Sequence, residues 1–386
     1  MLTTLAINNY RSVLDLTLPL GTLNVVTGAN GSGKSNLYRA LRLLAATARD
    51  DVVSALAHEG GLESTFWAGP ETLTRAMRDG TAPVQGGPRQ GPRRLRLGFA
   101  GDDYGYAIEL GLPKPDSTTV FNLDPEIKRE VIWAGATPRP AALLVERRGP
   151  LVKVRDDQGW RVVAEHLNSF DSLFSQVADA RSAPEVLALR ERIRSWRFYD
   201  HFRTDVDAPA RRVRLGTRTP VLHHDGGDLA AALQTIREIG DRVALDQAIE
   251  DAFPGARLGI EALPDGRLRL AFHQHGLLRP LTAAELSDGT LRYLLLVAAL
   301  LTPRPPSLMV LNEPENSLHP DLLPALARLI VAAAEHSQIW VISHATRLVA
   351  ALNQAPACAG FQLEKELGET RVAGQGLLER PRWQWP

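Results

Sequence analysis

Cysteine is almost absent from this sequence. Its 386 residues include one, Cys358, which excludes an internal disulfide and a cysteine-based zinc site. Long apolar runs are missing as well, since no uncharged stretch approaches the roughly 20 residues that cross a bilayer. The N-terminus has neither a basic segment nor a continuous hydrophobic one, so the sequence indicates no signal peptide. We therefore expect a cytoplasmic protein that has no membrane partner.

Net charge is missing too, because 44 Lys and Arg residues balance 44 Asp and Glu residues. This balance excludes a global basic field, so any contact with DNA must be local. Arginines gather at 93–96, 147–148 and 211–218, which leaves such a contact open. Solvated or ion-paired side chains are the simpler explanation of each cluster. The apolar content of 44% is sufficient for the core of one elaborated domain or of two domains.

Glycine, by contrast, is concentrated where a phosphate can bind. Residues 28–35 read GANGSGKS, the full P-loop pattern, between an apolar run at 23–27 and a helical apolar pattern. The glycines let successive N–H groups turn toward the phosphates, and the helix N-terminus adds partial positive charge. Lys34 would reach the β- and γ-phosphates of ATP, and the Ser35 hydroxyl would bind Mg²⁺. A turn that only capped a helix would need neither side chain.

A second candidate region follows the hydrophobic strand predicted at 308–311, which ends in Asn312-Glu313. Ligands bind at the carboxyl ends of parallel strands, where Glu313 could act as general base on an attacking water. Asn312 stands where P-loop ATPases usually carry an acidic residue near Mg²⁺. Its amide oxygen can accept a bond from a metal-bound water but has no charge, so we expect weaker Mg²⁺ binding. A simple turn into a helix would explain Pro320 but not two glutamates after a buried strand.

Two further motifs have both a structural and a functional interpretation. LSDGT places Ser287 and Gly289 at the start of a long apolar helix, where Ser287 is a good N-cap and the helix start is an anion site. VISH ends the strand predicted at 338–342 with Ser343-His344. A lone histidine is more often structural than catalytic, but this one follows the strand beside the candidate base.

The P-loop, LSDGT, the strand that ends in NEPE and the strand that ends in SH together resemble the ABC-type ATPase heads of the SMC and RecF branch. The sequence is most similar to the compact bacterial ATPases of the AAA15 and AAA21 kind, which are related to the OLD-family ATPase domain. INNYRS at 7–12 resembles the N-terminal strand of that branch, which brings an arginine, here Arg11, near the nucleotide. The resemblance is strong over 1–65 and 250–350 and covers the middle only in general layout.

The resemblance implies an α/β P-loop NTPase fold, the ABC ATPase head, with a mixed or parallel core sheet. We expect a discontinuous ATPase core at 1–65 and 250–350, an inserted antiparallel β lobe at 66–164, a helical lid at 165–249 and a C-terminal tail at 351–386. The local patterns predict strands in the lobe, TTVFNL at 118–123 among them, a hairpin around the Pro-Asp-Gly turn at 264–266, and helices at 165–197 and 228–253.

The resemblance also implies a role for each motif residue. The residues expected to bind ATP are Arg11, Asn30, Gly31, Ser32, Gly33, Lys34, Ser35 and Asn36. Heads of this family close head-to-tail around two ATP molecules, so Ser287 and Gly289 would contact the nucleotide of the opposite subunit in a homodimer. Catalysis would depend on Glu313, His344 and Lys34, and Mg²⁺ would be held by Ser35 and Asn312.

The sequence departs from the family in other places besides Asn312. No glutamine follows the P-loop helix at the position of the Q-loop, for which 59–69 is the candidate equivalent, and we expect no TOPRIM nuclease domain after His344. Two hypotheses stay open. The first is an ATP-hydrolysing, ATP-gated dimer in DNA repair, chromosome maintenance or phage defence. The second is an ATP-dependent switch that hydrolyses slowly or not at all and regulates a separate effector protein.

Overall fold

The computed structural model describes residues 1–386 except 85–91, 178, 180, 201 and 377–379. Its contacts divide the chain into two compact units. The first is formed by Met1–Gly21, Gly28–Trp196 and Phe361–Pro386, and the second by Thr22–Thr27 and Arg197–Gly360. Part of the Gly- and Pro-rich link predicted before residue 95 falls at 85–91 and lies outside the described residues.

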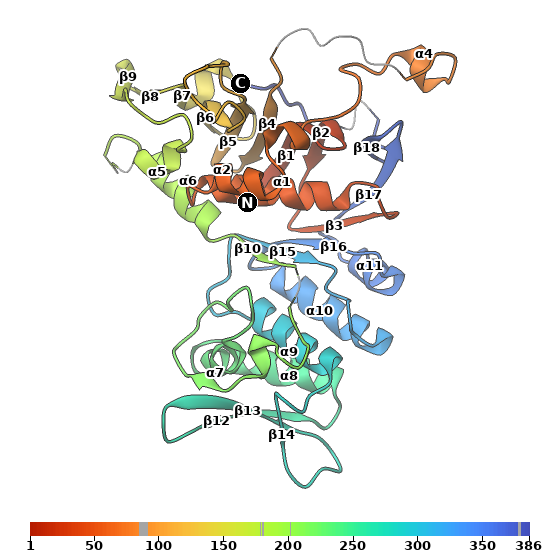
Figure 1. Cartoon of the computed structure of the whole chain (residues 1–386). Coiled ribbons are helices and arrows are strands. Elements are labelled where there is room, and N and C mark those ends of the chain that lie inside the picture. Colours follow the sequence, from red (N-terminus) through yellow and green to blue (C-terminus); the bar gives the residue numbers. More distant parts are fainter. Residues whose placement is uncertain (85–91, 178, 180, 201, 377–379) are drawn as a thin grey trace. The chain divides into compact units, whose positions relative to one another are not determined.

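Among the described residues, eight antiparallel strands form the large sheet of the first unit, in the order β2-β1-β4-β5-β6-β7-β8-β9 (Figure 1). They are β1 (Leu2–Tyr10), β2 (Val13–Pro19), β4 (Leu95–Gly101), β5 (Tyr104–Gly111), β6 (Glu126–Ala134), β7 (Leu143–Arg148), β8 (Leu151–Asp156) and β9 (Gly159–Ala164). Because β4 pairs with β1 and places Phe99 opposite Leu5, the later strands extend the N-terminal hairpin into one sheet.

The helix that follows the P-loop packs on this sheet. It contacts β1 and β4 and buries Leu37, Leu41 and Leu44, which confirms the apolar pattern predicted there. The helical segments of the first unit are α1 (Lys34–Thr47), α2 (Val52–His58), α3 (Leu62–Thr65), α4 (Arg75–Arg78), the 3₁₀ turn η1 (Pro140–Ala142), α5 (Leu173–Gln176) and α6 (Pro184–Arg194).

The C-terminal residues form a hairpin that the sequence did not predict. It consists of the antiparallel strands β17 (Cys358–Glu366) and β18 (Glu369–Val372), and its register places Glu366 opposite Glu369. Leu367 and Gly368 have φ angles of 50° and 86°, the left-handed pair that closes a tight two-residue turn.

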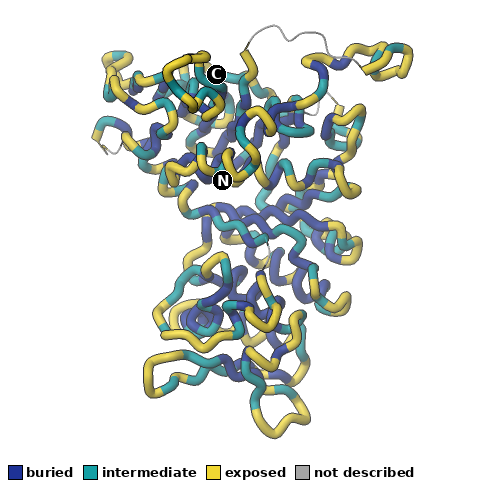
Figure 2. Tube along the Cα trace, in the orientation of Figure 1, coloured by how far each residue is buried: buried dark blue, intermediate teal, exposed yellow. Residues whose placement is uncertain are grey.

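Parallel strands build the sheet of the second unit, where β10, β15, β16 and β3 are neighbours in that order. They are β3 (Leu23–Gly28), β10 (Arg197–Tyr199), β15 (Leu308–Asn312) and β16 (Gln338–Ile342). All of β16 and nearly all of β15 is buried, as expected for parallel strands covered on both faces (Figure 2). The carboxyl ends of β3, β15 and β16 share one edge, and the P-loop, NEPE and SH each begin where one of these strands ends.

The core of the second unit is built around α9, whose residues from Leu291 to Leu300 are all buried. The helical segments of this unit are the 3₁₀ turns η2 (Pro209–Arg211) and η3 (Pro320–Leu322), α7 (Leu229–Ile239), α8 (Arg242–Ala252), α9 (Asp288–Leu300), α10 (Leu323–Ala333) and α11 (Thr346–Leu352). Among the described residues, no helix is both long enough and apolar enough to span a membrane.

A small antiparallel sheet completes the second unit. The predicted hairpin is confirmed as β12 (Arg257–Ala262) and β13 (Arg267–His273), and Gly266 in its turn has a φ of 77°. Two short strands, β11 (Arg214–Leu215) and β14 (Leu281–Thr282), pair with β13.

The strand predicted at 118–123 is wrong. Asp116 and Asn122 close this segment into a loop, since the Asp116 N–H donates to Asn122 Oδ1 at 2.8 Å and Asn122 Nδ2 donates to the Asp116 carbonyl at 2.7 Å. Thr118 adds a third bond, from its N–H to Asp116 Oδ1 at 2.8 Å. Side chains therefore satisfy backbone groups that would otherwise join a strand ladder.

The helices predicted at 165–197 form only in part, as the short and separate segments α5 and α6. Buried Arg147 explains why no helix forms at 168–171, since its guanidinium donates to the carbonyls of Asn168 (2.7 Å) and Asp171. Glu130, the ion-pair partner of Arg147, accepts the N–H of Leu173 at 2.9 Å. Backbone groups at 168–173 therefore bond to the buried pair of Arg147 and Glu130, which takes the place of some of the hydrogen bonds of a helix.

Candidate nucleotide site

The P-loop of the first unit has the backbone that phosphate binding requires. Gly31 and Gly33 lie in the left-handed region, with φ angles of 80° and 107°. Gly33 is the N-cap of α1, which has no side-chain cap and no acidic residue in its first turn. The start of this helix therefore keeps the positive potential that attracts an anion.

The side chains of the P-loop supply cationic and hydroxyl groups. Lys34 is 8% exposed, and its Nζ donates to the carbonyls of Gly28 at 2.7 Å and Ala29 at 3.1 Å. Ser35 is exposed, whereas Ser32 is buried and its hydroxyl has no hydrogen-bond partner within the described part of the chain. An ammonium, N–H groups of a helix start and two hydroxyls are a donor set that fits the phosphates of ATP together with Mg²⁺.

Arg11, the arginine expected near the nucleotide, is bound to an acidic residue. Its Nη2 and Nε donate to Glu59 Oε2 at 2.7 and 3.1 Å, and the Tyr10 hydroxyl donates to the same oxygen at 2.6 Å. Burial, followed by the bond to Glu59, raises the pKa of Tyr10 far above its usual range. Glu59 is the first residue of 59–69, the candidate equivalent of a Q-loop. Its bonds to Tyr10 and Arg11 connect this segment to the end of the N-terminal strand.

Glu313 has a strained backbone at the carboxyl end of β15. Its φ of 48° is uncommon for a residue other than glycine. Its N–H donates to the Ile342 carbonyl at 2.8 Å, and its Oε2 accepts Asn316 Nδ2 at 2.9 Å. Nδ1 of His344 lies 3.6 Å from Glu313 Oε1, which is an ion pair when the histidine is protonated. The predicted base and the predicted histidine therefore lie side by side.

Glu315 connects the two strand ends and was not among the predicted site residues. Its buried Oε1 accepts the Ser343 hydroxyl at 2.7 Å and the N–H groups of His344 and Ala345 at 3.0 and 3.2 Å. Three donors on one carboxylate oxygen fix the loop that carries His344. The signal in the sequence was the second glutamate of NEPE, which follows a buried strand but gives no indication of its partners.

Arg292 links the LSDGT helix to the candidate base. This buried side chain donates from Nη2 to the Glu313 carbonyl at 3.1 Å and from Nη1 to the Phe202 carbonyl at 3.3 Å. Burial lowers the pKa of Arg292, while the charges of Glu315 and Glu313 act in the opposite direction. The guanidinium holds the strained Glu313 peptide from the side of α9.

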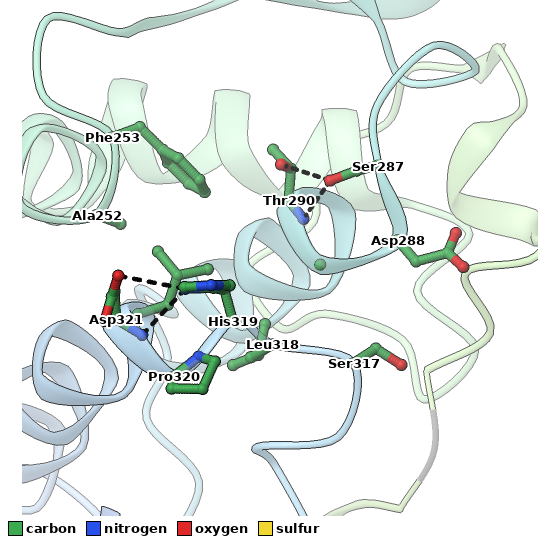
Figure 3. Close-up of a pocket in the computed structure, with 12 residues that line it drawn as sticks. Ala252, Phe253, Ser287, Asp288, Thr290, Ser317, Leu318, His319, Pro320 and Asp321 are labelled. Carbon is green, nitrogen blue, oxygen red and sulfur yellow. Dashed lines mark hydrogen bonds and ion pairs between the residues drawn. The ribbon is translucent and has the colours of Figure 1, made fainter. Parts of the chain in front are cut away.

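A groove of about 810 Å³ lies between the start of α9 and the loop after NEPE (Figure 3). Ser287 is the N-cap of α9, as predicted, and its Oγ accepts the Thr290 N–H at 3.2 Å. Gly289 is required by close packing, since a Cβ there would lie 2.8 Å from the Ser317 carbonyl oxygen. The residues that line the groove are Ala252, Phe253, Ser287, Asp288, Gly289, Thr290 and 317–322.

Arg211 stabilises the loop that leads into α9. Its guanidinium donates to the Leu286 carbonyl at 2.7 Å and to Asp288 Oδ1 at 2.8 Å, and its side chain is 9% exposed. Arg147 is fully buried in its pair with Glu130. Arg211 and Arg147 belong to the arginine clusters that could have contacted DNA, and both instead have structural roles.

The HHD stretch at 223–225, which has the residue types of a metal site, forms a loop. His223 Nδ1 lies 2.8 Å from Asp225 Oδ1, and the part of the chain that the structure describes has no cluster of three or more metal-ligating side chains. Asp228 is the N-cap residue of α7, but its carboxylate accepts the His223 N–H and makes no cap bond to the helix.

The predicted residues fall into three groups. Asn312, Glu313 and His344 lie at the sheet edge of the second unit, and Ser287 and Gly289 line the groove of that unit. The P-loop residues Asn30 to Asn36 and Arg11 belong to the first unit. Within this set, contacts join Glu313 to His344, whereas Arg11 contacts Glu59, which the sequence did not single out.

A parallel sheet whose strand ends carry a P-loop and an acidic segment defines a P-loop NTPase fold. The chain belongs to the family described as "AAA domain, putative AbiEii toxin, Type IV TA system", whose model matches residues 23–350. The chain is therefore an AAA-domain protein with a P-loop NTPase fold. Proteins of this kind generally bind ATP with Mg²⁺ and hydrolyse it.

Solved structures show the same fold at low sequence identity. A structure titled as an Smc head bound to the C-terminal winged-helix domain of ScpA aligns with a TM-score of 0.52 at 15% identity, covering 98% of this chain and 99% of that one. An Smc head with an extended coiled coil, bound to the C-terminal domain of ScpA from Pyrococcus furiosus, aligns with a TM-score of 0.50 at 12% identity, covering 98% and 97%. No curated protein sequence matches the chain.

Proposed function

We propose that this chain binds ATP with Mg²⁺ at the P-loop and hydrolyses it, with Glu313 as the general base. The observation that carries the proposal is the pairing of a left-handed, hydrogen-bonded Glu313 with His344 at the sheet edge where the chain enters the P-loop. Glu313 would take the proton of the attacking water while the bond to the bridging oxygen breaks, which yields ADP and phosphate.

The P-loop residues would bind and orient the triphosphate. Lys34 would exchange its two carbonyl partners for phosphate oxygens, and the N–H groups at the start of α1 would hold the β-phosphate. Ser35 and Asn312 would hold Mg²⁺, which neutralises charge on the phosphates when bound. His344 would act on the γ-phosphate from its place beside Glu313.

The active form would be a homodimer gated by ATP. Ser287 and Gly289 begin a buried helix beside an open groove, so the start of α9 could meet the γ-phosphate held by a second copy. The functional division into core, lobe, lid and tail is part of this proposal, as is a cytoplasmic location. A separate effector protein and DNA are the partner classes that it allows.

The biological role we favour is phage defence, ahead of DNA repair or chromosome maintenance. The family description names a putative toxin within a toxin–antitoxin system, that is, one of two components, and such a pair fits defence better than repair of DNA or maintenance of chromosomes. We therefore expect a partner protein that the ATP-bound state would control.

A second candidate function is a switch that binds ATP and hydrolyses it slowly. Asn312 favours this candidate, because β15 ends in a neutral amide where a carboxylate would attract Mg²⁺. Under this proposal the γ-phosphate would maintain a bound state for long periods instead of driving a rapid cycle.

Calorimetric titration with ATP and Mg²⁺, together with phosphate release, tests both candidates. Lys34→Ala should weaken ATP binding by about tenfold or more through loss of a charge-assisted bond, whereas the exposed Lys114→Ala should bind normally. Glu313→Gln should bind ATP but hydrolyse about 100-fold more slowly. If native protein shows no affinity for ATP, or Lys34→Ala binds equally well, the proposal fails.

Restoring the missing charge distinguishes the two candidates. Asn312→Asp should raise turnover at saturating ATP by about tenfold, equivalent to about 1.4 kcal/mol of barrier, if the native protein is a slow switch. Rapid native turnover that Asn312→Asp leaves unchanged would instead favour the hydrolysing enzyme.

A further inference from the structure

The C-terminal hairpin packs against the P-loop within the first unit. A Cβ on Gly28 would lie 2.5 Å from the Leu363 carbonyl oxygen of β17, and one on Gly33 would lie 2.1 Å from Thr370 Oγ1 of β18. The glycines at the two ends of the loop therefore allow close approach of the hairpin as well as unusual φ angles. Neither contact can be read from the P-loop pattern at 28–35, because both partners lie more than 300 residues further along the chain.

Thr370 is the residue through which the hairpin bonds to the loop. It is 1% exposed, its N–H donates to the Ser12 carbonyl at 2.7 Å, and its Oγ1 donates to the Ser32 carbonyl at 2.9 Å. Ser12 lies in the turn between β1 and β2, and its Oγ is 2.6 Å from Thr370 Oγ1. Asn36, in the first turn of α1, donates from Nδ2 to Ser12 Oγ at 2.6 Å.

The single proton of each hydroxyl determines which group donates in each bond of this chain. Each hydroxyl has one proton, and that of Thr370 is donated to Ser32, so Ser12 must donate to Thr370. Ser12 can then accept from Asn36. The chain runs from Asn36 through Ser12 and Thr370 to Ser32, and both of its ends belong to the P-loop.

The last bond determines which way one P-loop peptide points. A trans peptide directs its C=O and N–H to opposite sides. Because the Ser32 carbonyl points to Thr370, the N–H of Gly33 is directed away from β18. Gly33 has no Cβ and a φ of 107°, so its own backbone does little to prevent this peptide from turning over.

We propose that Thr370, together with Ser12, is a positioning residue for nucleotide binding, which holds the Ser32–Gly33 peptide with the Gly33 N–H directed to the phosphates. This inference rests on the proposed binding of ATP at the P-loop. It assigns the C-terminal hairpin a role in the site, although the hairpin contributes no group that touches the nucleotide.

Calorimetric titration of ATP and Mg²⁺ into four variants of the full chain tests the proposal. Thr370→Val keeps the shape and removes the hydroxyl, so the Kd for ATP should rise about tenfold, whereas Thr370→Ser keeps the hydroxyl and should stay within about twofold of native. Ser12→Ala leaves the bond from Thr370 to Ser32 and should raise the Kd about threefold.

Thr47→Val is the matched control. Its buried hydroxyl also donates to a backbone carbonyl, that of Leu44 at 2.7 Å, but lies in the last turn of α1. This variant should lower the urea midpoint about as much as Thr370→Val and leave the Kd for ATP at the native value. Equal losses of affinity in Thr47→Val and Thr370→Val would show a general effect of stability and overturn the positioning role.

The two proposals fail in different ways. If native protein binds ATP and Thr370→Val binds it equally well, the positioning role is overturned and the proposed function stands. If native protein itself does not bind ATP, the proposed function is overturned, and the inference that rests on it falls as well.

Discussion

Asp200 carries a titratable carboxyl at the sheet edge of the second unit. It follows Tyr199, which pairs with Leu311, so it lies beside the strand end that carries Asn312 and Glu313. The residue is half-buried, and burial raises its pKa to about 6. A carboxyl with a raised pKa is best accommodated by the folded chain when it is protonated.

The sign of the resulting pH dependence follows from the two pKa values. An unfolded aspartate titrates near 3.9, so the stability linked to protonated Asp200 is fully present below about pH 3.9 and is lost as pH rises through about 6. The unfolding free energy of native protein, relative to Asp200→Asn, should fall by about 1–2 kcal/mol between pH 4 and pH 7 after a discount for solvent screening.

Urea unfolding at pH 4.5, 5.5, 6.5 and 7.5 checks this expectation. Asp124→Asn, at an exposed position, is the matched control and should follow the native protein at every pH. A native-minus-Asp200→Asn difference that stays constant across this range would contradict a raised pKa at Asp200.

At the scale of elements, α9 depends on a glycine for its place beside the loop after NEPE. Alanine is normally preferred over glycine in a helix by about 0.8–1 kcal/mol. At residue 289, however, the added Cβ would lie 2.8 Å from the Ser317 carbonyl oxygen, a backbone atom that cannot yield cheaply. Gly289→Ala should therefore destabilise the protein by about 1–3 kcal/mol.

Urea unfolding of Gly289→Ala beside Gly360→Ala measures that effect. A Cβ at Gly360 would meet its nearest neighbour, Asn353 Oδ1, at 3.6 Å, which is an ordinary contact. Stabilisation by Gly289→Ala would mean that helix propensity outweighs the contact with Ser317, contrary to the packing described above.

Elements with a clear local pattern could be predicted from the sequence. The alternation that predicted β5, β6, β12 and β13 reflects strands with one face on a core, and α9 and β16 were evident from continuous apolar runs. β10 has three residues and forms because β15 lies beside it, so its pairing is absent from any local window. The hairpin of β17 and β18 escaped prediction in a tail with weak signals.

The residues of the candidate site also include some that the sequence could predict and some that it could not. Motif residues such as Lys34 and Glu313 are recognisable because phosphate chemistry restricts both residue type and spacing. Glu315, Arg292 and Thr370 act through backbone carbonyls and N–H groups far away in the sequence, which no spacing rule describes. Arg11 has the residue type expected, but its bond to Glu59 became visible only in the structure.

At the scale of the whole molecule, the proposed homodimer makes the start of α9 a surface that must stay open. Ser287 lies at the exposed start of this helix and lines the groove in Figure 3. A long cationic side chain there would occupy the space where a second copy would present its nucleotide. Ser287→Arg should therefore block ATP-dependent association and reduce phosphate release by about 100-fold, as expected for loss of groups that complete a phosphoryl-transfer site.

Light scattering with ATP and Mg²⁺ tests the dimer directly. Glu313→Gln should double in mass at saturating ATP, because a γ-phosphate that is not cleaved keeps both copies bound. Ser117→Arg adds the same charge and bulk to an exposed loop of the first unit and should behave as native protein does. A Glu313→Gln variant that binds ATP yet stays monomeric, or a monomeric Ser287→Arg that releases phosphate at the native rate, would show that one copy completes the site by itself.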